Sequence, residues 1–88
     1  MHGRFDIDTI HILHMGVDSS VAQSLFFLGL SEGLKTCTCT TTDLAMEALE
    51  QTEPTIIIVD QSVVDEEFLK IKSIKEYFFS DSILMRVV

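Results

Sequence analysis

Two kinds of hydrophobic pattern alternate along the chain. Short apolar runs with many β-branched residues predict buried strands, whereas apolar residues spaced by three and four predict helices. Four runs of the first kind predict strands at residues 9–15, 35–40, 55–59 and 83–88. Three stretches of the second kind predict helices at residues 20–32, 44–51 and about 65–79. The order βαβαβαβ, with right-handed connections between parallel strands, predicts a doubly wound α/β fold with helices on both faces of the sheet.

Polar residues and glycine mark where the helices should begin and end. Asp18 or Ser19 is suited to cap the first helix, and Thr42 or Asp43 the second, because short polar side chains accept hydrogen bonds from free helical N–H groups. Gly33 follows the first helix, where a left-handed residue commonly ends a helix. These signals place the boundaries of the first two helices.

Length, charge and cysteine usage narrow the class of protein. The 88 residues suit one domain, residues 1–88, and their 47 % hydrophobic content is that of a globular chain. A formal net charge of −8, with no Lys or Arg in residues 36–69, argues against nucleic-acid binding. No apolar run approaches the roughly 20 residues of a membrane span, and no signal peptide is apparent. Cys37 and Cys39 suit free thiols in a reducing cytoplasm, where we expect the protein.

The third predicted strand carries a resemblance to a known family. Residues 56–59 (IIIV) followed by Asp60 resemble the third strand and phosphoacceptor aspartate of response-regulator receiver domains. Residues 45–49 (AMEAL) resemble the second helix of that family, and Gly33 with Leu34 matches the end of its first helix. The resemblance implies a flavodoxin-like sheet with strand order 2-1-3-4, without the family's last strand and last two helices.

The departures from the receiver pattern bear on chemistry. Receivers carry two acids at the end of the first strand, which hold the Mg²⁺ that neutralises the transferring phosphoryl group. Gly16 and Val17 stand at those positions, and Asp18 lies one residue further on. The lysine of the fifth strand has no counterpart. Asp60 therefore stands at the phosphoacceptor position without the groups that would assist phosphoryl transfer.

We therefore expect a degenerate receiver-like module that acts by phosphorylation-independent protein–protein interaction, as a homodimer or with a protein partner. We expect no enzymatic activity and no cofactor. The alternative is a phosphoacceptor domain of a two-component phosphorelay. In that case Asp60 is the nucleophile, and Asp18 with another acid such as Asp8 recruits Mg²⁺.

The apolar residues of the first predicted helix and the last predicted strand indicate where contacts with a second copy or a protein partner form. The helix has a core stripe at Val21, Leu25 and Leu28, but a second apolar stripe runs around its side. The last predicted strand leaves an apolar edge without a partner, and such edges invite pairing with another chain. Two copies related by a two-fold axis would cover these surfaces. The predicted interface residues are Ala22, Phe26, Leu30, Met85 and Val87.

Three further hypotheses have weaker support. His11 and His14 suggest a metal site with Cys37 and Cys39, but residues three apart on a strand face opposite ways. We interpret them as partly buried histidines and core cysteines. A small-ligand pocket near Asp60 and the end of the first strand rests on fold analogy alone. The chain could also be a piece of a longer regulator.

Overall fold

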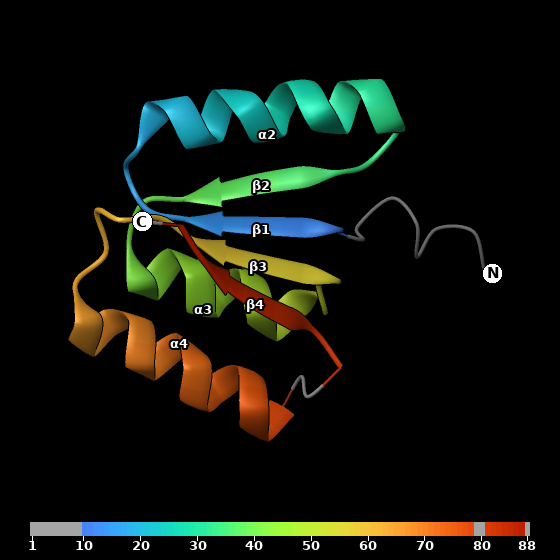
Figure 1. Ribbon diagram of the computed structural model, residues 1–88. Coiled ribbons are helices and arrows are strands. Elements are labelled where there is room, and N and C mark those ends of the chain that lie inside the picture. Colours follow the sequence, from blue (N-terminus) through green and yellow to red (C-terminus); the bar gives the residue numbers. More distant parts are fainter. Residues whose placement is uncertain (1–9, 79–80, 88) are drawn as a thin grey trace, which may run out of the picture.

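The computed structural model describes residues 10–78 and 81–87 of the chain, in which strands and helices alternate (Figure 1). The strands are β1 (Ile12–Met15), β2 (Thr36–Cys39), β3 (Ile56–Val59) and β4 (Ile83–Arg86). The helices are α2 (Ser19–Glu32), α3 (Thr42–Gln51) and α4 (Asp65–Phe78). The strands form one parallel sheet in the order β2-β1-β3-β4. The predicted α/β class and strand order are confirmed.

Each strand is shorter than the segment predicted for it. β1 pairs with both neighbours over four residues only, from Ile12 opposite Ile56 to Met15 opposite Val59. The described residues at the ends of the predicted segments, such as Ile10, Lys35 and Val87, lie outside these four-residue ladders. Predicted element ends at residues 9, 79 and 88 lie outside the described residues.

The helix caps follow the sequence signals with one correction. Asp18 is the N-cap of α2, and Gly33 ends the helix in the left-handed conformation, at φ 69°. The N-cap of α3 is Thr41, and the prediction of Thr42 or Asp43 was wrong. Thr41 has an extended backbone, and its hydroxyl oxygen accepts a hydrogen bond from the Leu44 N–H at 3.2 Å, so Thr42 already belongs to the helix.

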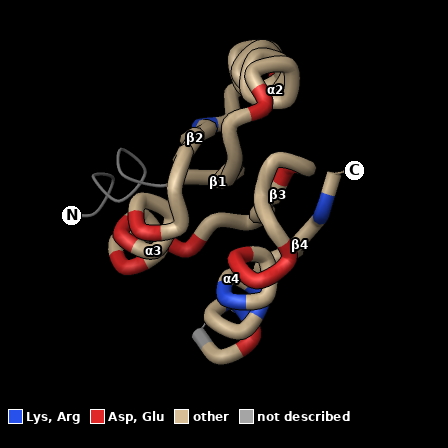
Figure 2. The backbone as a smooth tube through the Cα atoms, turned by 90° about the vertical axis from the view of Figure 1, so that its left-hand side faces the viewer, with Lys and Arg blue, Asp and Glu red and all other residues tan. Residues whose placement is uncertain are grey.

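The helices lie on both faces of the sheet but cover them unequally. Figures 1 and 2 show α3 and α4 together on one face and α2 alone on the other, beside β2. Most of the core lies between the sheet and the pair α3–α4. It comprises Leu13, Met15, Cys39, Ala45, Leu49, Ile57, Val59, Val63 and Ile71. On the other face of β3, Ile56 and Ile58, which alternate with the core residues, are only half-buried.

A single arginine fastens the edge strand β4 to the start of α4. The guanidinium of Arg86 pairs with the Asp65 carboxylate at 2.6 Å and donates a hydrogen bond to the Val63 carbonyl at 3.1 Å. It also lies 4.7 Å from the centre of the Phe68 ring, a cation–π contact. β4 is therefore held by its ladder to β3 and by this contact.

α2 approaches β2 closely through a glycine. A Cβ atom on Gly29 would lie 2.7 Å from the Leu34 carbonyl oxygen and 3.0 Å from the methyl group of Thr36. Gly29 therefore sets the distance between helix and strand. Neither α2 nor any other helix in the described ranges has the length and apolarity needed to cross a membrane.

Candidate functional site

Asp60 follows β3 at the carboxyl end of the sheet, beside the end of β1. This is the point where the strand order reverses, because the chain crosses from β1 to β2 on one side and later to β3 on the other. Ligands of open α/β sheets commonly bind at such a point. Here the side chain of Asp60 is completely buried, with 0 % of its surface exposed.

The Asp60 carboxylate accepts four hydrogen bonds. Oδ1 accepts from the backbone N–H and the hydroxyl of Ser62, at 2.8 and 2.5 Å. Oδ2 accepts from Nε2 of His14 at 2.7 Å and from the Asp18 N–H at 3.0 Å. An ionised carboxylate offers about four lone-pair sites, so the acceptor capacity of Asp60 is used within the protein.

His14 is the partner that sequence reasoning missed. Its side chain is 1 % exposed, so the interpretation of a partly buried histidine was wrong. Because an ionised carboxylate only accepts hydrogen bonds, Nε2 carries the proton shared with Asp60, and Nδ1 lies 3.2 Å from the Thr38 hydroxyl. A histidine within an apolar run was the available signal, since a buried ring needs a polar partner.

The loop after β1 lies directly against Asp60. Gly16 has φ 137°, a conformation that favours glycine, and a Cβ atom there would lie 2.2 Å from the Asp60 carboxyl group. The next residue, Val17, exposes its side chain and donates its N–H to the Ser62 hydroxyl oxygen at 2.9 Å. The two positions that match the receiver acid pair are therefore occupied by backbone packed around the aspartate.

Asp18 serves as a helix cap beside the same site. Its Oδ1 accepts hydrogen bonds from the backbone N–H groups of Ser20 and Val21, at 3.0 and 3.4 Å, and its Oδ2 accepts from the Gln61 amide at 3.4 Å. Only its backbone contacts Asp60. A magnesium ion needs several oxygen ligands in near-octahedral geometry, and the described residues here do not fit one. Asp8, the other acid named for this role, lies outside the described residues.

The hydrogen bonds also determine the charge of Asp60. Burial alone raises its pKa, because it disfavours the charged form. The hydrogen bonds from the side chain and backbone of Ser62, the backbone of Asp18 and the ring of His14 outweigh burial and lower the pKa from 3.8 to about 2. Asp60 is therefore ionised at neutral pH, and hydrogen bonds from the protein stabilise its charge in place of water.

We expect Ser62→Ala to destabilise the fold and to change its response to acid. The lost hydroxyl should cost about 1–3 kcal/mol at pH 7, because Asp60 and Val17 both lose a partner. Because the pKa of Asp60 is lower in the folded protein than in the unfolded chain, its ionised form stabilises the fold by about 2 kcal/mol above pH 4. This stabilisation is lost as the pH falls toward 2. The difference between variant and wild type should therefore shrink from pH 4 to pH 2.

Urea unfolding followed by circular dichroism at pH 7, 4 and 2.5 measures this difference. The exposed Ser73 on α4 offers the control, since Ser73→Ala should change stability by no more than about 0.5 kcal/mol at any of these values. An equal loss for Ser62→Ala at all three pH values would contradict the proposed hydrogen bonding.

The structure separates the predicted interface residues into two groups. Ala22 and Phe26 border a hollow on the β2 side of α2, together with Thr38. Met85 and Val87 belong to β4 and the residue that follows it, at the opposite edge of the sheet. All of the predicted interface residues are exposed except the half-buried Ala22.

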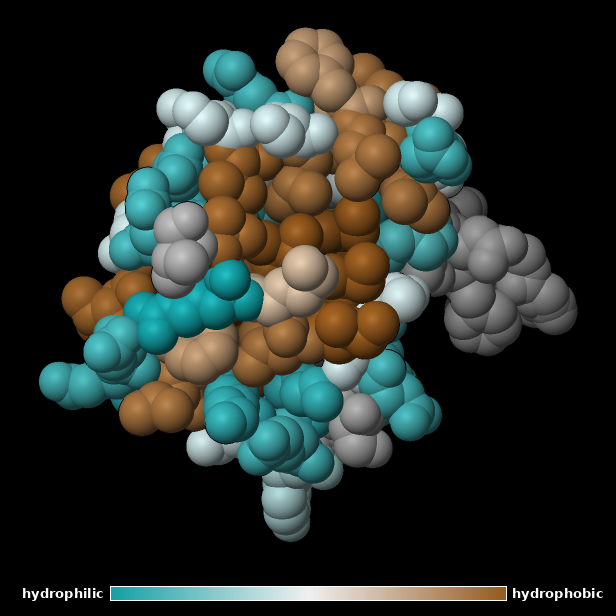
Figure 3. Space-filling model, viewed as in Figure 1, coloured by the Kyte–Doolittle hydropathy of each residue, from teal (hydrophilic) through white to brown (hydrophobic). Residues whose placement is uncertain are grey.

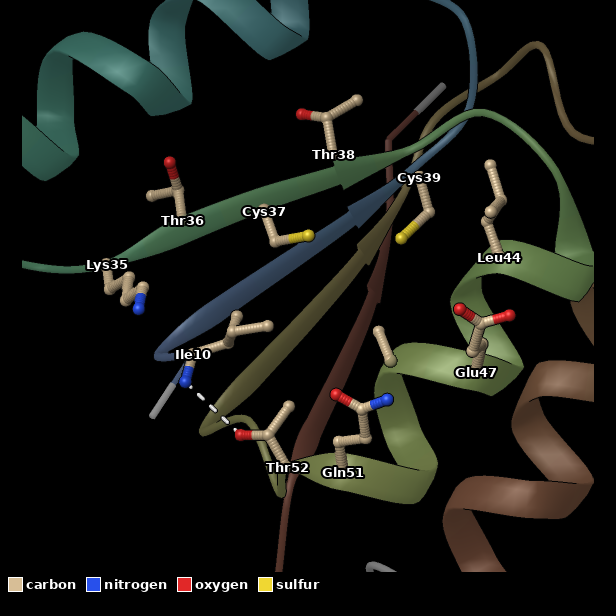
Figure 4. Close-up of a pocket in the computed structure, with 11 residues that line it drawn as sticks. Ile10, Lys35, Thr36, Cys37, Thr38, Cys39, Leu44, Glu47, Gln51 and Thr52 are labelled. Carbon is tan, nitrogen blue, oxygen red and sulfur yellow. Dashed lines mark hydrogen bonds between the residues drawn. The ribbon is translucent and has the colours of Figure 1, made fainter. Parts of the chain in front are cut away.

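A second candidate site is an open hollow of about 620 Å³ between β2 and α3 (Figure 4). Cys37 and Cys39 point toward it from the same side of β2, and Glu47 borders it from α3. Both cysteines are free. Burial raises the pKa of Cys39 to about 11, with further contributions from Cys37 and Glu47. A thiol of that pKa is a poor nucleophile and metal ligand at neutral pH.

The hollow offers no third ligand in a suitable position. Among the described residues, no three His, Cys, Asp or Glu side chains gather into a group that could hold a metal ion. In the part of the chain that the structure describes, the buried network around Asp60 joins a carboxylate, an imidazole and two hydroxyl groups.

No protein-family model matches this chain, and the searches of curated proteins and of solved structures also found no match. The fold and the site define the class only as a parallel α/β domain with a buried His–Asp pair where the strand order reverses. The receiver resemblance stays one of pattern and strand order.

Proposed function

We propose that this protein is a degenerate receiver-like signalling module that acts by protein–protein contact and without phosphorylation. The observation that carries the proposal is the occupied state of Asp60, which accepts four hydrogen bonds and exposes none of its surface. A phosphoacceptor must present a free lone pair to an incoming phosphoryl group, and here each lone pair already has a donor.

The surroundings of Asp60 support the same proposal. Phosphoryl transfer needs positive charge close to the transferring group, supplied by Mg²⁺ or a lysine. Gly16 and Val17 offer no carboxylate for a metal, and Asp18 is engaged as a helix cap. The groups that would neutralise the charge of a phosphoryl group do not meet at this point.

In this proposal Asp60 has a structural role and holds in place the loops beside a binding surface. It ties the loop before α2 to the loop before α4 through Asp18 and Ser62, and so fixes the direction of α2. The partner is a protein, a second copy included, and not a nucleic acid, since the chain carries a net charge of −8. Two free cysteines suit the reducing cytoplasm as its compartment.

Incubation with acetyl phosphate and Mg²⁺, followed by intact-mass measurement, tests the proposal. We expect no added phosphoryl mass, while a receiver domain with an intact acid pair is modified in parallel and shows that the donor is active. A stoichiometric mass gain that Asp60→Asn abolishes and Asp65→Asn does not would favour the alternative of a working phosphoacceptor.

A further inference from the structure

One face of the sheet carries an uncovered apolar surface. On the side of α2, no helix of the described residues lies over β3 and β4 (Figure 1). Ile83 and Met85 are 54 % and 48 % exposed there, and Ile56 and Ile58 are half-buried. Figure 3, which views this face, shows hydrophobic surface running from α2 down across the sheet. The surface is continuous with the helix and not a scatter of single residues.

The helix beside this face is apolar around most of its circumference. Leu25 faces the sheet and is buried. Successive residues turn by about 100° around a helix, so Phe27 and Leu30 lie on the outward side, and they are 64 % and 67 % exposed. No charged residue occurs between Asp18 and Glu32. A helix that is hydrophobic all round is typical of one that is covered on all sides.

The uncovered part of the sheet has the width of one helix. Neighbouring strands lie about 4.8 Å apart, so β3 and β4 together span about 10 Å, which matches the 8–10 Å between packed helices. Within residues 10–78 and 81–87, no further layer covers the outward side of α2. A helix would cover β3 and β4, and a sheet would cover the outward side of α2. A second copy of the chain can supply both.

We propose that a second copy of this chain covers this face, with the α2 helices of the two copies side by side in one layer between two sheets. A two-fold axis that runs along the strands places each α2 over β3 and β4 of the other copy. The outward Phe27 and Leu30 of one copy then meet Ile83 and Met85 of the other. Leu28, on the flank of α2 opposite Phe26, meets its own counterpart. This inference rests on the proposed function and names its partner.

The charge distribution favours this face for contact between identical chains. Each copy carries a net charge of −8, so a self-contact through charged surface would be repulsive. Figure 2 shows the acidic residues concentrated on α3, α4 and the loops, whereas α2 carries charge only near its end. The second copy therefore meets an uncharged surface.

The exposed apolar area is also of the size that a stable dimer needs. Seven large side chains lie exposed on α2, on its leading loop and on this face of β4. They are Val17, Phe26, Phe27, Leu28, Leu30, Ile83 and Met85. At roughly 100 Å² each they approach the ~800 Å² that one partner buries in a standard interface.

Light scattering coupled to size exclusion, with the 88-residue chain loaded at concentrations from the low micromolar to the high micromolar range, tests the inference. We expect twice the chain mass for the wild type. Phe27→Asp and Met85→Asp, one on each of the two surfaces that meet, should each weaken dimerisation by roughly 100-fold or more, because each buries an unpaired charge.

Leu69→Asp is the matched control, since Leu69 is 55 % exposed on α4, on the opposite face of the sheet, and its replacement should leave the dimer intact. Circular dichroism and urea unfolding of each variant establish that it is folded. A monomeric wild type overturns the inference. So does a dimer that only one of the two variants affects, because pairing along the β4 edge would not involve Phe27, and pairing of α2 helices alone would not involve Met85. Neither result bears on the absence of phosphorylation, which the acetyl phosphate experiment tests separately.

Discussion

Gly16→Ala is expected to destabilise the protein by about 4–5 kcal/mol. The added Cβ atom would lie 2.2 Å from the Asp60 carboxyl group, and the backbone would have to keep φ 137°. Asp60 would have to move and leave its four donors without an acceptor. A domain of this length has a total stability of about 4–13 kcal/mol, so this loss is a large part of it.

Gly33→Ala separates the effect of contact from that of backbone conformation. Gly33 also has a positive φ, of 69°, but a Cβ atom there would have no neighbour within 4 Å. We expect a loss of about 1 kcal/mol, from the left-handed conformation alone. Urea unfolding of the two variants measures both values. A loss for Gly16→Ala as small as that for Gly33→Ala would show that the loop after β1 does not pack against Asp60.

Asp60→Ala is expected to cost about 3–5 kcal/mol, because it removes one partner of a buried, hydrogen-bonded pair. His14 would keep a buried ring nitrogen without an acceptor, and the N–H groups of Asp18 and Ser62 would lose theirs. The two loops that Asp60 joins should loosen together. Hydrogen exchange of these amides should accelerate more than exchange in α3.

Asp65→Ala is the control for the loss of a carboxylate. Asp65 pairs with Arg86 at 2.6 Å, closer than His14 lies to Asp60, but its side chain is 83 % exposed. Exposed ion pairs contribute about 0–1 kcal/mol because water screens them. If both variants lose the same stability in urea unfolding, Asp60 does not hold the fold together as proposed here.

The elements of the fold were largely predictable, because they follow from local patterns. The alternation of Cys and Thr over residues 36–39 predicted β2 and its two faces, which Figure 4 shows. Gly33 predicted the end of α2. The start of α3 was predicted at residue 44, two residues too late, because Thr41, Thr42 and Asp43 are all capable caps, and only the backbone conformation distinguishes them.

The sequence predicted the central residue of the candidate site and the loop residues 16–18 beside it, but not the partners His14 and Ser62. Asp60 stands out because an acid directly follows an apolar strand. Its partner His14 lies 46 residues away in sequence, and the parallel pairing of β1 with β3 brings the two together. Ser62 is close in sequence, but its role depends on a turn that returns its N–H and hydroxyl to Asp60. A hydropathy pattern contains neither relation.

The sequence by itself determined which segments are strands and helices, that the sheet is parallel, and that Asp60 directly follows a central strand. These properties depend on spacing along the chain, where hydrophobic periodicity acts locally. The tertiary structure alone decided that Asp60 is satisfied by His14, Asp18 and Ser62, and that no helix of the described residues covers β3 and β4 on the side of α2. Hydrogen-bond partners and burial depend on which distant segments of the chain come into contact. The register of the sheet and the placement of the helices determine those contacts.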